Sequence, residues 1–489
     1  QGNASLMKAL VITNTGHSAP YDLIISAAIS GVHGLTKTGA GAVRLSASNS
    51  FAGPVTINQG LLSSWNADAL GNTNTPVTVN SGGTLHVGGN VTFAPKPLVL
   101  NGPGWSGGGF NGALAASDGN CVWTGVITNA SDSVIYVHAV RSLEINGPIR
   151  GPGGLTKSGA GTNIFSGPLP NTYAGVTRVN DGILILNKPD GVKSVPGDLE
   201  IGGGIVGGPS VRLGSVLQIA STAEVFIDAG GLLACGTNYA CMGALRGSGT
   251  VNFGAGGYLL LMQGGGTCIF NGTMTGIGYA PGYTLGKTGG GTFIMNGDAN
   301  FSAGNIQVFG GKLVVNGVTA RPAIVETIAT LGGHGTVGAI TNYGAIAPGS
   351  SAGKLNSGNL SFGVNGSLAI ELNGNAAGSG YDQLNVAGGV NLTGAVLAPL
   401  TVGFLPRQGD RFVIINNDGS DPVAGTFTGL AEGAVISDST GKFHFRVSYV
   451  GGSGNDVELT MINQSLAGGA ACVLSGNGNG VLDPNECNL

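Results

Sequence analysis

The residues best suited to bind a ligand lie near the end of this sequence. A loop there places oxygen-bearing groups at positions 1, 3, 5, 7, 9 and 12, which are Ser475, Asn477, Asn479, Val481 through its carbonyl, Asp483 and Glu486. With Gly480 at position 6, this spacing is typical of a loop that wraps Ca²⁺. Only two of the side chains are anionic, so the pattern predicts a weak calcium site. A Gly- and Asn-rich turn without a metal is the alternative.

The cysteines favour disulfides and therefore an oxidising compartment. Cys472 and Cys487 bracket the calcium-type loop, far from the other four cysteines, and we expect them to pair. Cys235 and Cys241 are close in sequence and form the second expected pair. Pairing of Cys241 with Cys268, about one repeat away, is also compatible with disulfide geometry. Cys121 would then remain a buried thiol.

No residue pattern indicates a catalytic site. The segment Gly349–Gly353 fits the G-x-S-x-G spacing of a hydrolase nucleophile, but no helix pattern follows to build the required turn. The six histidines are scattered. Asp181 and Asp228 are isolated, so the paired carboxylates of a polysaccharide-cleaving enzyme are not visible. A sugar-binding platform, with packing anchors as the alternative reading, could be formed by Trp65, Trp105 and Trp123.

The elements that position these residues come from internal repeats. The phrase Gly34–Gly41 (GLTKTGAG) returns as Gly154–Gly161 (GLTKSGAG) and, more altered, as Thr284–Gly291. Each copy is followed by an Asn-aromatic step and a strand that ends in Gly. From Lys37 to Gly60, Lys157 to Gly182 and Lys287 to Gly311 the distances are 23, 25 and 24 residues. A near-constant period of this length predicts the stacked coils of a β-solenoid, about twenty in a chain of this size.

Composition agrees with an all-β fold. Glycine accounts for 94 of 489 residues and charged residues for only 9%, which leaves too few Lys, Glu and Arg for solvated helix faces. Short alternating runs such as Val55–Asn58 are separated by Gly and Asn, as at solenoid corners. We expect Asn58, Asn180 and Asn316 to bond their counterparts one coil away. A net charge of −4 makes nucleic acid an unsuitable partner, and no apolar run is long enough to cross a membrane as a helix.

The repeat phrases, with their downstream Asn-aromatic steps, closely resemble the autotransporter-associated β-strand repeat of bacterial passenger domains. The later part resembles the passenger end of the same family, in segments Gly335–Val337, Ala347–Gly353, Tyr381–Val386, Gly409–Phe412 and Gly452–Thr460. The resemblance implies a right-handed parallel β-helix, surface display, and a role in adhesion or matrix. The family's membrane β-barrel has no counterpart after Thr460, so we expect a released passenger or a relative exported by another route.

These patterns suggest four segments. Residues 1–33 read as an N-terminal cap or exchange strand, residues 34–345 as β-helix repeats, residues 346–460 as a closing β region, and residues 461–489 as a disulfide-stapled tail. Because Gln1 enters directly into a strand-like run, we expect a secreted, extracellular or cell-surface protein whose signal peptide has been removed.

Three functions are compatible with this organisation. The first is a non-enzymatic structural solenoid that assembles end to end into filaments through unpaired strand edges. The apolar residues expected to mediate such assembly are Leu6, Leu10, Val11 and Ile12. The second is an adhesin for glycans or neighbouring surfaces, which would need rows of exposed Asn, Thr and aromatic residues along one flank. The third, a polysaccharide-degrading β-helix, would need carboxylates brought together from adjacent coils.

Overall fold

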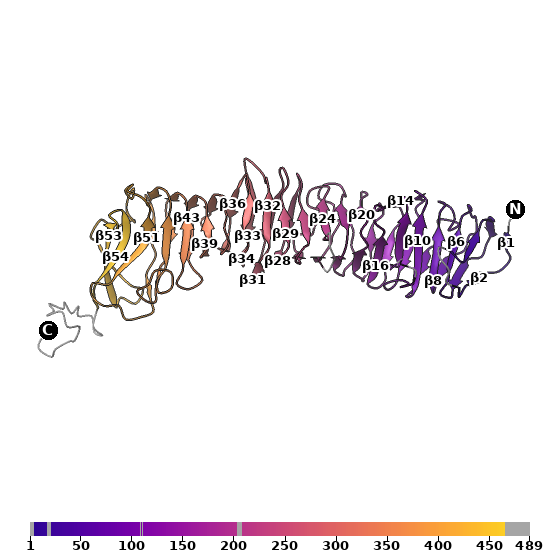
Figure 1. The fold of residues 1–489 in the computed structure, drawn as a ribbon, viewed down its shortest axis with the longest axis horizontal. Coiled ribbons are helices and arrows are strands. Elements are labelled where there is room, and N and C mark those ends of the chain that lie inside the picture. The colour runs from indigo at the N-terminus through magenta and orange to yellow at the C-terminus, as the bar shows by residue number, and fades with distance from the viewer. Residues whose placement is uncertain (1–3, 17–20, 108, 110, 203–207, 465–489) are drawn as a thin grey trace, which may run out of the picture. The chain divides into compact units, whose positions relative to one another are not determined.

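The computed structural model describes residues 4–16, 21–107, 109, 111–202 and 208–464. These residues form 54 strands and no helix, and none of them could cross a membrane as a helix. The chain divides into two units. Figure 1 labels strands of both. Unit 1 comprises Gln1–Met262 and Gly272–Ile277, and unit 2 comprises Gln263–Asn271 and Gly278–Leu489. The calcium-type loop, Cys472 and Cys487 lie outside the described residues, so those predictions stay predictions.

Unit 1 is a stack of coils whose strands pair in parallel with the coils before and after them. Three sheets result, and each of the four coils from β9 to β20 contributes one strand to every sheet, whereas the other coils contribute to fewer. Sheet A contains β2 (Leu10–Thr13), β5 (Leu35–Thr38), β7 (Val55–Ile57), β9 (Val77–Val79), β12 (Leu98–Leu100), β15 (Ile127–Asn129) and β18 (Ile149–Arg150). Sheet B contains β3 (Leu23–Ile25), β6 (Ala42–Leu45), β8 (Gly60–Ser64), β10 (Gly83–Gly88), β13 (Leu114–Asp118), β16 (Ser133–Val137), β19 (Leu155–Ser158), β21 (Thr177–Val179), β23 (Leu199–Ile201), β25 (Glu224–Ile227) and β28 (Ala244–Gly247).

Sheet C completes the coils of unit 1. It contains β11 (Thr92–Phe93), β14 (Asn120–Trp123), β17 (Ser142–Ile145), β20 (Thr162–Phe165), β22 (Ile183–Leu186), β24 (Ser210–Leu213), β26 (Leu232–Ala234), β29 (Thr250–Asn252) and β32 (Thr273–Gly276). Two short parallel pairs accompany the three sheets: β1 (Ala4–Leu6) with β4 (Ile29–Gly31), and β27 (Tyr239–Met242) with β30 (Tyr258–Met262).

The alternation of apolar and polar residues explains why these segments form stacked strands. In sheet A the register aligns Val55, Val77 and Leu98, and all three side chains are fully buried. The next residue along each of these strands points outward, because successive side chains of a strand lie on opposite faces. A single coil would leave its inner row exposed, whereas stacking covers it. Burial of each such side chain contributes about 1.5–3 kcal/mol.

Unit 2 is built in the same way at its start. Sheet D contains β33 (Tyr283–Thr288), β36 (Asn305–Val308), β38 (Ala323–Val325), β41 (Ile340–Asn342), β44 (Leu360–Phe362) and β48 (Val390–Asn391). Sheet E contains β31 (Thr267–Phe270), β34 (Thr292–Met295), β37 (Gly311–Val315), β39 (Ala329–Gly333), β42 (Ala345–Pro348), β45 (Ser367–Leu368) and β49 (Val396–Leu397). Unit 2 also contains β35 (Ala299–Phe301) and a parallel pair, β46 (Glu371–Leu372) with β50 (Thr401–Val402).

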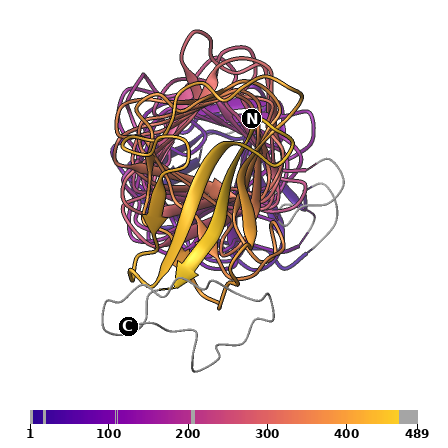
Figure 2. The same cartoon turned by 90° about the vertical axis from the view of Figure 1, so that its left-hand side faces the viewer.

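A third sheet ends the parallel stack of unit 2. Sheet F begins with the parallel strands β40 (Thr336–Val337), β43 (Lys354–Ser357), β47 (Gln383–Val386) and β51 (Arg411–Asn417). It continues antiparallel through β54 (Asp456–Gln464), β53 (Phe443–Gly451) and β52 (Val435–Ser437). Figure 2 shows the long yellow strands β53 and β54 lying across the end of the unit 2 coils. The ring of Phe412 packs edge-on between Tyr381 and Phe445, which fills the core at this end.

The strands stack into about 16 turns, fewer than the twenty that the repeat period predicts. Later coils are longer, which accounts for part of the difference. Neighbouring coils place Asn58 and Asn80 22 residues apart, but Asn356 and Asn385 29 residues apart. The predicted segment boundaries at residues 33, 345 and 460 stay predictions.

Candidate functional surfaces

The lysine of the repeat phrase is a buried structural group. Lys37, Lys157 and Lys287 are at most 1% exposed. The Nζ of Lys37 donates hydrogen bonds to the carbonyl oxygens of Thr38 at 2.9 Å, of Gly39 at 2.6 Å and, in the next coil, of Gln59 at 3.1 Å. Lys287 bonds its own turn and the following coil in the same way, and Lys157 bonds its own turn. The ammonium group therefore holds the repeat turn, and in two copies ties it to the next coil.

Sequence reasoning gave no role to these lysines, although the signal was present. Leu35 and Lys37 are two residues apart on one strand, so they must point to the same, inner face. Burial lowers the pKa of Lys37 and of Lys157 to about 8, while the nearby carboxylates of Asp22 and Asp181 act in the opposite direction. Amines with lowered pKa serve as nucleophiles in some enzymes. Here they are enclosed by backbone and cannot reach a substrate.

The glycine that ends each repeat lies directly over the preceding turn. Gly182 has φ +63°, and a Cβ there would lie 2.5 Å from the carbonyl oxygen of Gly161 and 2.6 Å from that of Gly159. Both the left-handed backbone and the close approach of two coils require glycine. The register pairs Lys157 with Val179, so one coil here is 22 residues, and the 25 residues from Lys157 to Gly182 are one coil plus three residues of the turn.

The asparagine of the Asn-aromatic step joins three coils. The Oδ1 of Asn171 accepts a hydrogen bond from the backbone N–H of Ile149 at 2.9 Å, and its Nδ2 donates to the carbonyl of Ser194 at 2.8 Å. Asn49 bridges Ile29 and Ala69 in the same manner. Both asparagines are buried, whereas Asn300 in the third copy is exposed on β35. The repeats are alike in sequence but not in contacts.

A second set of asparagines forms ladders on the surface. The Nδ2 of Asn80 donates to the Oδ1 of Asn58 at 2.8 Å, and that of Asn316 donates to Asn296 at the same distance. The expected bonding between counterparts is therefore confirmed for Asn58 and Asn316. It is wrong for Asn180, because the register of β21 with β19 and β23 places Ser158 and Gly202 in the neighbouring coils, and neither is an asparagine.

A polar cluster on the outer face of sheet B contains His86, whose side chain is fully buried. The Nδ1 of His86 lies 2.8 Å from the Oγ of Ser63, and its Nε2 lies 2.8 Å from the Oγ of Ser117. Ser117 also donates to the carboxylate of Asp118 at 3.1 Å. Burial lowers the pKa of His86 to about 4, so the imidazole is neutral at pH 7. Although the residue types match those of a hydrolase, Ser63 and His86 are fully buried and closed to substrate.

The tryptophans do not form a shared sugar-binding platform. Trp123 is fully buried in the core beside Phe93. The guanidinium of Arg44 lies 3.6 Å from the ring centroid of Trp65, and Gly88 packs against the same ring. The backbone N–H of Trp105 donates to the Oγ1 of Thr84 at 3.0 Å, in a loop that lies over sheet B. Packing anchors, the alternative reading, describe Trp123 and Trp65 better.

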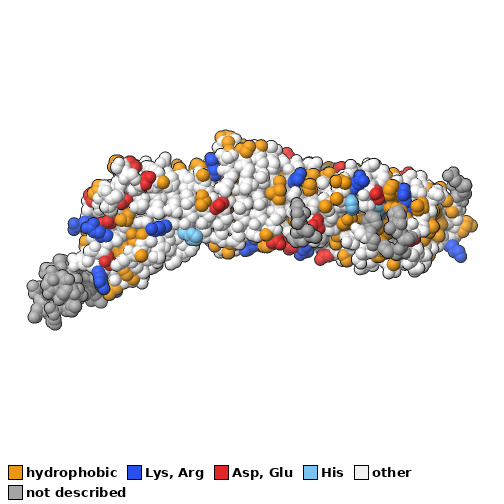
Figure 3. Space-filling view, viewed as in Figure 1, with side chains coloured by type: hydrophobic (Ala, Val, Ile, Leu, Met, Phe, Trp, Pro, Cys, Tyr) orange, Lys and Arg blue, Asp and Glu red, His pale blue; other side chains and the backbone are white. Residues whose placement is uncertain are grey.

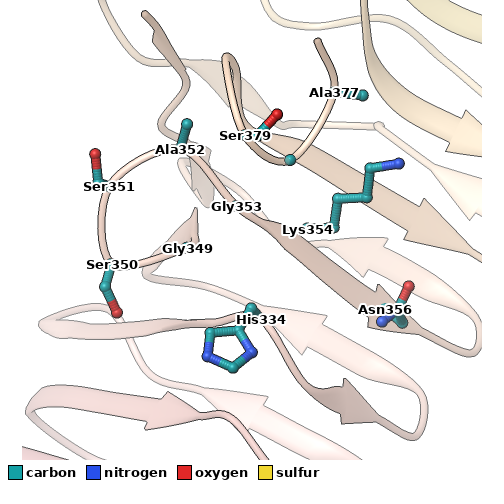
Figure 4. Close-up of a pocket in the computed structure, with 11 residues that line it drawn as sticks. His334, Gly349, Ser350, Ser351, Ala352, Gly353, Lys354, Asn356, Ala377 and Ser379 are labelled. Atoms are coloured by element: carbon teal, nitrogen blue, oxygen red, sulfur yellow. The ribbon is translucent and has the colours of Figure 1, made fainter.

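The segment that matches G-x-S-x-G lines an open groove of about 550 Å³ in unit 2 (Figure 4). It connects β42 to β43, so the strand-to-helix turn of a nucleophile elbow is absent from this described segment. Figure 4 shows the hydroxyls of Ser350 and Ser351 on opposite sides of the loop and the amine of Lys354 pointing away from both. The carboxylate of Asp382 accepts the N–H of Gly353 at 2.9 Å, and burial raises its pKa to about 7. This carboxylate anchors the loop.

The predicted disulfide between Cys235 and Cys241 is wrong. Both residues are free cysteines in the structure. The side chain of Cys235 is fully buried, whereas Cys241 alternates with the inward residues Ala240 and Met242 and therefore points outward from β27. Alternation places the two thiols on opposite sides of the coil wall. The thiol of Cys268 donates to the Oε1 of Gln263 at 3.2 Å, and Cys121 is buried, as expected.

The expected assembly residues lie at the first coil of unit 1. Leu6 ends β1, which pairs with β4, while Leu10, Val11 and Ile12 lie in β2, which pairs in parallel with β5. Ile12 is buried, whereas 58% of Val11 is exposed. The segment from Leu6 to Ile12 is thus already paired within the first coil of its own solenoid. Within the described residues, β2 is the terminal strand of sheet A.

The outer face of sheet A carries aligned rows of uncharged polar residues. Five outward positions that follow one another in register are Thr36, Thr56, Thr78, Val99 and Thr128. A row two residues further along each strand includes the ladder of Asn58, Asn80 and Asn101. On the molecular face drawn in Figure 3, charged side chains stand singly or in small groups without a continuous patch of either sign. Within the described residues, no three His, Cys, Asp or Glu side chains are arranged to hold a metal ion.

This chain is similar in sequence to known proteins, and a model of a known repeat matches it. Over 287 residues, 53% of this chain, the sequence is 29% identical to the adhesin BmaC autotransporter of Brucella suis biovar 1 (strain 1330), and it spans 7% of that protein's length. The crystal structure of the Haemophilus influenzae Hap adhesin aligns with a TM-score of 0.29 and 11% identity, over 93% of this chain and 64% of the Hap chain. The model of the passenger-associated transport repeat matches residues 35–63, 155–186 and 285–315. This chain therefore carries three copies of the autotransporter passenger-associated transport repeat.

Proposed function

We propose that this chain is an adhesin-like β-solenoid displayed outside the cell or on its surface, where its outer sheet faces bind other surfaces. The observation that carries the proposal is the similarity to an autotransporter adhesin over 53% of the chain, in a sequence with three passenger repeats. Repeats of this kind build a rigid support, and each added coil extends the outer faces.

The side chains of the described residues support binding rather than chemistry. The cluster of Ser63 and His86 is enclosed, and Ser351 lies on a loop that lacks the turn of a hydrolase nucleophile, as described above. In contrast, outward rows of Thr and Asn run along one flank of unit 1, which is what an adhesin of this fold needs. A flat array of weak contacts favours attachment to another extended surface, where many contacts act together.

The proposal is tested by attachment of beads that carry the purified chain to cultured epithelial monolayers, to bacterial lawns and to plastic. We expect more attachment than for uncoated beads on at least one surface. A variant with a charge in the core, Leu184→Asp, is the control, because Leu184 is fully buried and its loss should unfold unit 1. Attachment of the native chain no better than that of this variant on all three surfaces would refute an adhesive role.

A second candidate, end-to-end assembly, is favoured by the first coils of unit 1. Leu23 points along the inner row with Val43, yet 41% of it is exposed, because no coil covers it within the described residues. Met7 and Ile24 nearby are 87% and 55% exposed. Open strand edges with apolar side chains are suited to pair with another chain. Sedimentation of the chain as a single species at every concentration would exclude this assembly.

A further inference from the structure

We give the name threonine face to the outer surface of sheet A from β5 to the start of β18. It consists of three rows of outward residues that run parallel to the stack of coils. The central row is Thr36, Thr56, Thr78, Val99 and Thr128. The flanking rows are Pro54, Pro76, Pro97, Val126 and Pro148 on one side, and Thr38, Asn58, Asn80, Asn101 and Ala130 on the other.

None of these fifteen residues is charged or buried. The first charge along the central row is the exposed Arg150 of β18, which follows Thr128 in register and bounds the face at that end. The other two sheets of unit 1 carry charges on their outer faces, such as the Arg178–Glu200 ion pair on sheet B and Arg212 on sheet C. Sheet B is also partly covered, since every residue of β8 and β10 is buried. The threonine face is therefore both open and neutral, which excludes attraction to a charged polymer as its source of affinity.

The hydroxyls of the central row are available for a ligand. Within the described residues, those of Thr36, Thr56, Thr78 and Thr128 make no hydrogen bond. This contrasts with Thr250 and Thr273 on sheet C, whose hydroxyls lie 3.3 Å from each other. Each unbonded hydroxyl offers one donor and two acceptor positions, and each methyl group beside it is apolar.

The spacing of these groups indicates the form of the ligand. Neighbouring coils repeat at about 4.8 Å, and the rows lie about 7 Å apart across the strands. The face is the outer side of a parallel sheet, whereas sites for small molecules are concave. A flat and regular array fits a ligand that is itself flat and regular. Alternating hydroxyl and C–H surfaces are the chemistry of a sugar chain.

We infer that the threonine face binds neutral polysaccharide whose chains are packed side by side, such as a crystalline β-linked glucan. The inference rests on the proposed adhesive function and assigns it a ligand class and a surface. Threonine hydroxyls and asparagine amides would bond the sugar hydroxyls, while the proline rings and threonine methyls would lie against the C–H faces. Because no ion pairs are involved, binding should be nearly independent of salt.

The test measures depletion of the purified full chain from solution by microcrystalline cellulose, by chitin particles and by carboxymethyl-cellulose beads. The test variant is the double substitution Thr56→Lys and Thr78→Lys, which places two charges at the centre of the face without touching the core. The matched control is Thr250→Lys with Thr273→Lys, an outward pair in adjacent coils of sheet C. We expect the wild type to bind one or both neutral particles, the test variant to bind about tenfold more weakly, and the control to bind like the wild type.

Binding of the test variant equal to that of the wild type would overturn the inference, as would absence of wild-type binding to both neutral particles. Loss of wild-type binding in 1 M NaCl, or a preference for the carboxymethyl beads, would also overturn it. The same preparations are used in the bead attachment assay on cells. Attachment to cells without binding to cellulose or chitin refutes the inference and leaves the adhesive function intact. Failure in both assays refutes both.

Discussion

The contacts of Asn171 predict that equivalent asparagines of the repeats contribute differently to stability, although their sequences are alike. Replacement of Asn171 by Ala removes one acceptor and one donor, and leaves the N–H of Ile149 and the carbonyl of Ser194 without their partner. Both backbone groups belong to fully buried residues, so water cannot replace the side chain. At about 1–3 kcal/mol for each unsatisfied buried group, the substitution should cost about 2–6 kcal/mol.

The corresponding residue of the third repeat provides the control. Asn300 is exposed, and a surface substitution without such contacts changes stability by less than about 0.5 kcal/mol. Urea unfolding of Asn171→Ala, Asn300→Ala and the wild type, followed by far-ultraviolet circular dichroism, measures the three stabilities. We expect unfolding of Asn171→Ala to begin at a lower urea concentration than unfolding of the wild type. The unfolding curve of Asn300→Ala should superimpose on that of the wild type.

A third variant tests which atoms matter. Asn171→Asp keeps the acceptor for Ile149 but places a carboxylate against the carbonyl of Ser194. The folded state should raise the pKa of this carboxyl, because only the protonated form can donate to Ser194. The variant should therefore be most stable below pH 4, the usual pKa of an unfolded Asp at about 3.9, and lose stability as the pH rises from there through the raised pKa of the folded state. Equal midpoints for Asn171→Ala and Asn300→Ala, or no dependence of Asn171→Asp on pH, would refute the bridging role.

Three further predictions concern the repeat turns and the loops. Gly182→Ala should lower the free energy of unfolding by well over 2 kcal/mol, because its Cβ would collide with the preceding coil. Gly191 also has positive φ but no atom near the position of a Cβ, so Gly191→Ala should lower it by only about 1–2 kcal/mol through backbone strain. Similar urea midpoints for the two variants would contradict a clash between coils. Val140 has φ +59° and is 89% exposed, so Val140→Asn should raise the melting temperature by relieving about 1 kcal/mol of strain at no loss of packing, and a lower melting temperature would show that the strain is absent. The pKa of Lys157 is about 8 in the folded state and near 10.5 when unfolded, so the unfolded chain binds the extra proton between these values and stability should rise with pH there, by up to about 3 kcal/mol. The difference in urea midpoint between the wild type and Lys157→Met at pH 8 and pH 10 isolates this effect, and a difference that does not change with pH would refute it.

Repetition in the sequence was sufficient to predict the stacked coils. A residue in a solenoid contacts the residues one period away, so an alternating strand such as Val55–Asn58 meets a similar strand in the next coil and the inner row follows. The same reasoning correctly predicted the Asn58 ladder. The sequence also contained the information that Lys37 points inward, because a residue two places from the apolar Leu35 on a strand must lie on the same face.

Only the tertiary structure decided the features that depend on neighbours of different sequence. Asn180 has no asparagine beside it, Asn300 has turned outward, and Cys241 lies on the opposite side of the coil wall from Cys235. None of these outcomes can be read from one coil alone, since each depends on the register and length of the next. The threonine face likewise exists because consecutive coils align Thr56 with Thr78 and leave their outer side uncovered. In sheet B, loops cover comparable strands and enclose His86 instead.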